Sequence, residues 1–164
     1  MSLRRAALGA AVVLTALLLQ TALSALPGPG PELLLLVTLA FAIAEGPASG
    51  AGTGFVAGLL ADLSADHEVG RLALAYVLAG FLAGLIRTGP DRSRLAVLGA
   101  VAAGAVVAVT AYATEGVLLT DPRTTFAAWS GALADTVAGC VLLAPVVVPV
   151  VGALVRRLDD EPRW

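Results

Sequence analysis

The sequence predicts an all-α integral membrane protein, and three observations lead to this class. The chain of 164 residues is 59% hydrophobic and only 13% charged, whereas a soluble domain has about 25% charged residues. Its apolar residues form runs that short polar or proline-containing turns separate. Glycines recur every four residues in one of these runs, a pattern that lets membrane helices approach closely. We expect one membrane domain, residues 1–164, built as a six-helix bundle.

The first run, residues 6–26, follows Arg4 and Arg5. At about 1.5 Å per residue, it matches the roughly 30 Å hydrocarbon core of a bilayer. A cleaved signal peptide is the alternative, because the small residues Ala22, Ser24 and Ala25 resemble a cleavage site. The run is long for a signal peptide, so we predict a transmembrane helix.

Two shorter helices, over residues 32–45 and 48–63, are expected after the proline-rich turn at 27–31. The dipeptide Gly46-Pro47 separates them. Each is shorter than the roughly 20 residues of a usual span, and together they are too long for one straight helix. They form either two short helices or a re-entrant hairpin.

A glycine series defines one face of the expected helix 48–63. Its members are four residues apart and end in a carboxylate: Gly46, Gly50, Gly54, Gly58 and Asp62. In water each glycine would weaken a helix by about 1 kcal/mol, but within lipid the backbone stays helical. The face is expected to pack against a helix or a partner. We expect Asp62 to hydrogen-bond the start of the next helix or to pair with Arg71.

Three more helices are expected over residues 71–87, 95–119 and 126–155. Pro145 and Pro149 should bend the last third of the final helix, and Trp129 is expected to lie at the headgroups. The final helix carries a second face with four-residue spacing, formed by Gly131, Asp135 and Gly139.

A carboxylate within the membrane costs a few kcal/mol, so Asp135 should face another helix or water. We expect a helix-packing hydrogen bond to Ser, Thr or Arg. A proton site or a ligand contact is the alternative.

The distribution of arginine predicts the orientation, since basic residues collect on the cytoplasmic side. All ten basic residues are arginine. With six crossings and a cytoplasmic N-terminus, only Arg71 and Arg123 lie outside. Eight are then cytoplasmic: Arg4, Arg5, Arg87, Arg92, Arg94, Arg156, Arg157 and Arg163. We expect both termini in the cytoplasm.

No constellation for catalysis, metal binding or nucleic-acid binding is recognisable. The only His–acid cluster contains one histidine, and its members are Asp62, Asp66, His67 and Glu68. A metal site needs three or four converging ligands, so we expect no metal. The patterns of phosphate loops and serine nucleophiles are missing, and no basic patch follows a groove-reading motif. The single Cys140 excludes an intramolecular disulfide and is expected to be a small buried residue. We predict a protein without cofactor or enzymatic activity.

The segment G-F-V-A-G-L-L-A-D-L, residues 54–63, resembles the MreD family of rod shape-determining membrane proteins, which shows G-F-x-x-G-L-x-x-D-L followed by a short loop and a glycine. Here the glycine is Gly70, and Leu74 and Tyr76 follow it. The family pattern falls on Gly54, Phe55, Gly58, Leu59 and Asp62.

The resemblance implies a non-enzymatic, multi-pass component of the elongation machinery in the bacterial inner membrane. Its implied partners in peptidoglycan synthesis are MreC, the MreB filament, RodA and a class B penicillin-binding transpeptidase. It also implies a fold similar to the S component of energy-coupling-factor transporters.

Three functions follow as hypotheses. The first is a scaffold whose glycine faces bind a partner helix, with the interface residues Gly46, Gly50, Gly54, Phe55, Gly58, Leu59, Asp62, Gly131, Asp135 and Gly139. The second is a vitamin-binding S component with contacts from Asp62, His67, Glu68 and Arg71, although such pockets usually converge more polar groups. The third is a proton-coupled carrier centred on Asp135, for which paired broken segments in both halves are missing.

Overall fold

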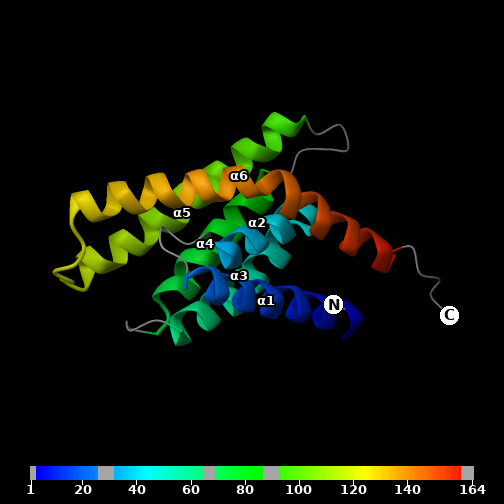
Figure 1. Ribbon diagram of the computed structural model, residues 1–164, viewed down its shortest axis with the longest axis horizontal. Coiled ribbons are helices and arrows are strands. Elements are labelled where there is room, and N and C mark those ends of the chain that lie inside the picture. The colour runs from blue at the N-terminus through cyan, green and yellow to red at the C-terminus, as the bar shows by residue number, and fades with distance from the viewer. Residues whose placement is uncertain (1–2, 26–31, 65–68, 87–92, 160–164) are drawn as a thin grey trace.

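The computed structural model describes residues 3–25, 32–64, 69–86 and 93–159. These residues form six α-helices and no strand, which confirms the predicted all-α class (Figure 1). The helices are α1 Leu3–Leu23, α2 Leu33–Glu45, α3 Pro47–Leu63, α4 Arg71–Leu85, α5 Arg94–Leu118 and α6 Phe126–Asp159. The expected ends of the first and fourth helices, residues 26 and 87, lie outside the described residues.

Helix α2 is the centre of the bundle. It contacts each of the other five helices, and every residue from Leu34 to Ile43 is buried. A helix enclosed on all sides needs no polar face, which is why this stretch is apolar around its whole circumference. The six helices are therefore arranged as one central helix and five that cover it.

The break between α2 and α3 depends on two adjacent residues. Gly46 has a φ of +106°, a backbone conformation that side chains strongly disfavour. Pro47 occupies the first turn of α3, where a residue without an N–H is tolerated. The structure thus forms two separate helices that pack against each other, an arrangement that two short spans and a re-entrant hairpin share.

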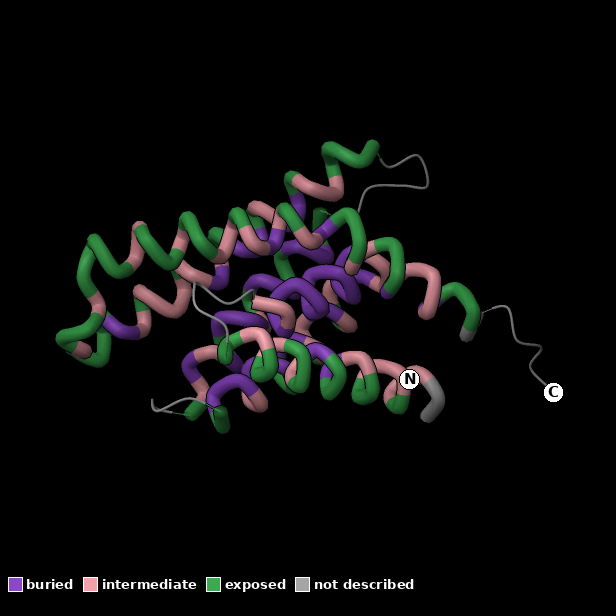
Figure 2. Tube along the Cα trace, viewed as in Figure 1, coloured by how far each residue is buried: buried purple, intermediate pink, exposed green. Residues whose placement is uncertain are grey.

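Three helices are long and apolar enough to cross a membrane: α1 over Arg5–Leu23, α5 over Arg94–Leu118 and α6 over Phe126–Arg157. Helices α2 and α4 are apolar but shorter. Figure 2 shows buried residues concentrated in the middle of the bundle and exposed residues along α1, α5 and α6. Many of the exposed residues are large and hydrophobic, for example Leu18, Leu95 and Leu142. This apolar exterior is the surface expected of a protein in lipid.

Helix α6 extends further than the sequence pattern indicates. It passes through Pro145 and Pro149 and ends at Asp159 rather than at residue 155. Each proline removes one backbone hydrogen bond, so a membrane helix bends there without ending. Figure 1 shows α6 changing direction in its last third, as expected.

Candidate functional site

The glycine face of α3 lies against α4. A Cβ atom at Gly50 would collide with the backbone of Gly80, one at Gly54 with that of Tyr76, and one at Gly58 with that of Ala73. As the residue number increases along α3, the number of the contacted residue decreases along α4. The two helices therefore run antiparallel with their backbones in contact. We call these residues the glycine seam. The face that was expected to receive a helix or a partner is thus occupied by a helix of the same chain.

Three other predicted interface residues lie around this seam. Gly46 forms the break before α3. Phe55 is 54% exposed on the outside of the bundle, and Leu59 is half-buried. Of the predicted interface residues on α3, only Phe55 therefore offers a large side chain to a second molecule.

Asp62 holds the beginning of α4. The residue is 1% exposed, and its carboxylate accepts hydrogen bonds from three backbone amides: Gly70 at 2.8 Å, Leu72 at 3.0 Å and Ala73 at 3.2 Å. The first amides of a helix have no partner within it, and the helix dipole favours a negative charge there. The structure therefore contains the first of the two contacts predicted for Asp62, and the carboxylate that ends α3 caps α4.

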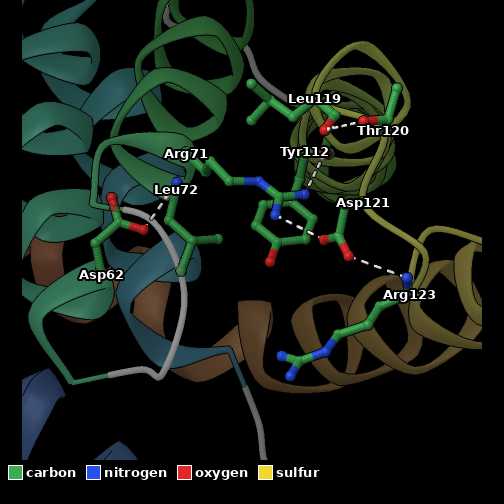
Figure 3. Close-up of polar contacts among 8 residues, drawn as sticks. All are labelled: Asp62, Arg71, Leu72, Tyr112, Leu119, Thr120, Asp121 and Arg123. Atoms are coloured by element: carbon green, nitrogen blue, oxygen red, sulfur yellow. Dashed lines mark hydrogen bonds and ion pairs between the residues drawn. The ribbon is translucent and has the colours of Figure 1, made fainter.

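Arg71 joins α4 to α5 and to the turn that follows it (Figure 3). The residue is 5% exposed, and its guanidinium donates to a carboxylate oxygen of Asp121 at 2.9 Å and to the carbonyl of Tyr112 at 3.5 Å. The guanidinium also lies over the Tyr112 ring, 4.3 Å from the ring centre, a distance at which a cation is attracted to the ring.

Asp121 is held from two sides. Its carboxylate accepts the backbone N–H of Arg123 at 3.0 Å as well as the guanidinium of Arg71. The backbone hydrogen bond, followed by the one from Arg71, lowers the pKa of Asp121 below its ordinary value. At neutral pH this carboxylate is charged and fixes the turn between α5 and α6 to α4.

A third contact lies near the beginning of α2. The hydroxyl of Tyr76 donates to Glu32 at 3.0 Å, and the side chain of Gln20 on α1 accepts the backbone N–H of Leu34 at 3.0 Å. Together these polar contacts tie α1 through α5 at the end of the bundle that the arginine distribution predicts to be outside. We call the set the Arg71 cluster: Gln20, Glu32, Asp62, Arg71, Tyr76, Tyr112 and Asp121.

Sequence reasoning missed Tyr112, Asp121 and the pair of Glu32 with Tyr76. Arg71 and Asp121 are fifty residues apart, and no spacing rule connects such positions. One signal was available. A lone arginine at the start of an apolar helix needs an acidic partner, and the turn at residues 120–125 contains Asp121.

Most side chains of the Arg71 cluster use their polar groups in hydrogen bonds that join the helices to one another. In the described part of the chain, no group of three or more His, Cys, Asp and Glu side chains is arranged to hold a metal ion. Two of the acids of the predicted His–acid cluster, Asp66 and Glu68, lie outside the described residues together with His67. Asp62 and Arg71, expected as ligand contacts of an S component, are each engaged in holding helices together.

The second glycine face, on α6, points away from the bundle, unlike the face on α3, which is buried against α4. Gly131 and Asp135 are exposed and Gly139 is half-buried, and a Cβ at either glycine would have no atom within 4 Å. Among the described residues, no hydrogen bond or ion pair reaches Asp135. The expected hydrogen bond to Ser, Thr or Arg is therefore absent within the described chain, because this side of α6 faces away from the bundle. The cysteine on the opposite side, Cys140, is buried as expected.

Comparison with known proteins adds one finding. The model of the family described as rod shape-determining protein MreD matches residues 5–157, nearly the whole chain. Neither a curated protein nor a solved structure shows significant similarity to the chain.

Proposed function

The chain belongs to the MreD family of rod shape-determining membrane proteins, and from this premise we propose that it is a non-enzymatic scaffold of the cell-elongation complex. In this proposal it resides in the bacterial inner membrane and binds the membrane-spanning part of MreC. RodA, a class B penicillin-binding transpeptidase and the MreB filament are the other members of the complex, which directs peptidoglycan synthesis along the cell.

The scaffold role is supported mainly by the contrast between the two glycine faces: the face on α3 is buried within the bundle, whereas the face on α6 is largely exposed. The seam between α3 and α4 brings two backbones into contact, and the Arg71 cluster fastens the helices at one end. Such contacts favour a bundle that keeps its shape. The exposed face of α6 makes no contact within the described bundle, as suits a surface that receives another protein.

The scaffold role is tested in rod-shaped cells that lack their own MreD. Expression of the tagged chain should restore rod shape, and MreC should be recovered with it from detergent extracts. Round cells despite normal expression of the chain, or a preparation without MreC, would contradict the proposal.

An S component similar in fold is the competing function. Thermal unfolding of the purified chain against a panel of vitamins separates the two. The scaffold role predicts no stabilisation by any vitamin, since the Asp62 and Arg71 side chains are already engaged. A clear shift of the unfolding temperature with one vitamin would favour the transporter.

A further inference from the structure

The exposed side of α6 follows a seven-residue pattern. Positions alternately three and four residues apart are all exposed: Ala128, Gly131, Asp135, Ala138, Leu142, Pro145 and Pro149. We call this line of residues the α6 stripe. An average spacing of 3.5 residues is the one at which a second helix, crossing at a shallow angle, stays in contact along its length.

The α6 stripe lies on the side of α6 that faces away from the other helices of the bundle. Helix α6 packs mainly against α5 and α2, and its buried residues are Cys140, Ala144, Val151 and Val155. The half of the stripe near Trp129 carries mainly small side chains, and an added Cβ at Gly131 would touch nothing. Small residues allow two membrane helices to approach closely. This half of α6 is open to a second helix.

The position of Asp135 indicates which kind of side chain the second helix must contribute. The residue lies six positions, about 9 Å along the helix axis, below Trp129, whose ring packs against Phe126. It is exposed on a helix apolar enough to cross the membrane. Lipid tails offer a carboxylate no hydrogen-bond donor or positive charge. The group that covers Asp135 must therefore supply one.

We propose that the α6 stripe is the docking surface for one membrane-spanning helix of a different protein, and that this helix carries an arginine or lysine level with Asp135. The proposal rests on the scaffold function and names the chemistry of its partner. A second copy of this chain on the same stripe would bring two Asp135 carboxylates together, and like charges disfavour that pairing.

Photo-crosslinking in membranes of cells that contain the full elongation complex tests the position of the helix. Single cysteines replace Gly131 or Ala138 on the stripe in a Cys140→Ala chain, and each carries a benzophenone. Ala132 and Ala134 are the matched controls, because both are small and exposed but lie about 80° to either side of the centre of the stripe's Trp129 half.

The stripe positions should give at least tenfold more protein adduct than the controls. Mass spectrometry should map the adduct to a membrane-spanning helix with a basic residue facing Asp135. Equal adducts from Ala132 and Ala134, adducts to lipid alone or to a second copy of the chain, or a helix without a basic residue there, would overturn the proposal.

Charge exchange tests the role of Asp135. Asp135→Leu should lower the adduct yield at Gly131 at least tenfold, whereas Asp135→Glu should keep it within about twofold. Asp135→Arg combined with Glu at the mapped basic residue should restore the yield. An unchanged yield in Asp135→Leu, or no recovery in the exchanged pair, refutes the ion pair.

Cell shape separates this inference from the scaffold function. If the unaltered chain fails to restore rod shape, the scaffold function fails. If the unaltered chain restores rod shape and recovers MreC, and Asp135→Leu does both equally well, the scaffold stands and the α6 stripe is not its docking surface.

Discussion

Among the described residues, two acidic side chains and one arginine make most of the side-chain hydrogen bonds between elements. Asp62 binds the first amides of α4, and Arg71, the first residue of α4, binds Asp121 beyond α5. A chain of contacts thus runs from α3 through α4 to the α5–α6 turn. Charged groups with little access to water are tolerated when they are paired or hydrogen-bonded. Asp62 accepts three backbone hydrogen bonds, and Arg71 and Asp121 form an ion pair.

The Asp62 cap predicts a selective loss of stability. Asp62→Asn keeps the shape of the side chain but removes its charge and turns an NH₂ group toward backbone N–H donors. We expect the free energy of unfolding in detergent to fall by about 1–3 kcal/mol. Asp135→Asn is the matched control, because that carboxylate makes no hydrogen bond within the described chain, and it should change stability by less than about 0.5 kcal/mol. Equal effects at the two positions would contradict the cap.

The lowered pKa of Asp121 predicts a dependence on acid. A carboxyl whose pKa is lower in the folded state stabilises the fold fully above its unfolded pKa, about 4, and loses that contribution as the pH falls through the folded value. The unfolding temperature should therefore decrease below about pH 4, and Asp121→Asn should flatten this decrease. Thermal unfolding from about pH 7 down to about pH 2.5 measures it. An identical pH profile in the variant would show that Asp121 does not contribute.

At the scale of the helices, periodicity predicted which residues share a face but not what the face meets. The four-residue spacing placed Gly50, Gly54 and Gly58 together, and the structure sets them against α4. The same spacing grouped Gly131 and Asp135 with Gly139, but that face is open, and the hydrogen bond expected for Asp135 is absent within the described chain. Both patterns are local properties of one helix. The choice of neighbour depends on the packing of all six.

The glycine seam predicts opposite outcomes for two glycines on one helix. Gly54→Ala places a methyl group against the Tyr76 backbone, which cannot move as a side chain can, so we expect a loss of about 1–3 kcal/mol. Gly52→Ala faces open space on α3 and should keep stability or raise it by up to about 1 kcal/mol, because alanine favours the helix and loses less backbone freedom on folding. Chemical unfolding in detergent compares the two. The seam would be contradicted if both variants unfolded alike.

For the whole molecule, composition and the spacing of the apolar runs were sufficient to predict an all-α membrane bundle with six helices, because few alternatives satisfy the backbone within lipid. The Arg71 cluster could not be predicted from the sequence, since its members come from distant parts of the chain. The same holds for the central place of α2: a stretch that is apolar from Leu33 to Ala44 except for Thr38 shows only that the helix is surrounded, and not which helices surround it.

The arginine distribution predicts that both termini are cytoplasmic, and cysteine labelling tests it. In a Cys140→Ala chain, Leu119→Cys lies in the turn before α6 and Ser93→Cys lies just before α5. A membrane-impermeant maleimide added to intact spheroplasts should label Leu119→Cys alone, and lysis should expose Ser93→Cys. The reverse pattern would invert the topology.

The enclosure of α2 by helices on both sides of it in the chain has a consequence for synthesis. Helix α2 leaves the ribosome before α3 to α6, yet α6 covers part of it, so this bundle closes only after α6 has been synthesised. A chain that stops at residue 125 should be recognised by membrane proteases and disappear faster than the complete chain in a pulse-chase experiment. Equal lifetimes would mean that α1 through α5 close around α2 unaided.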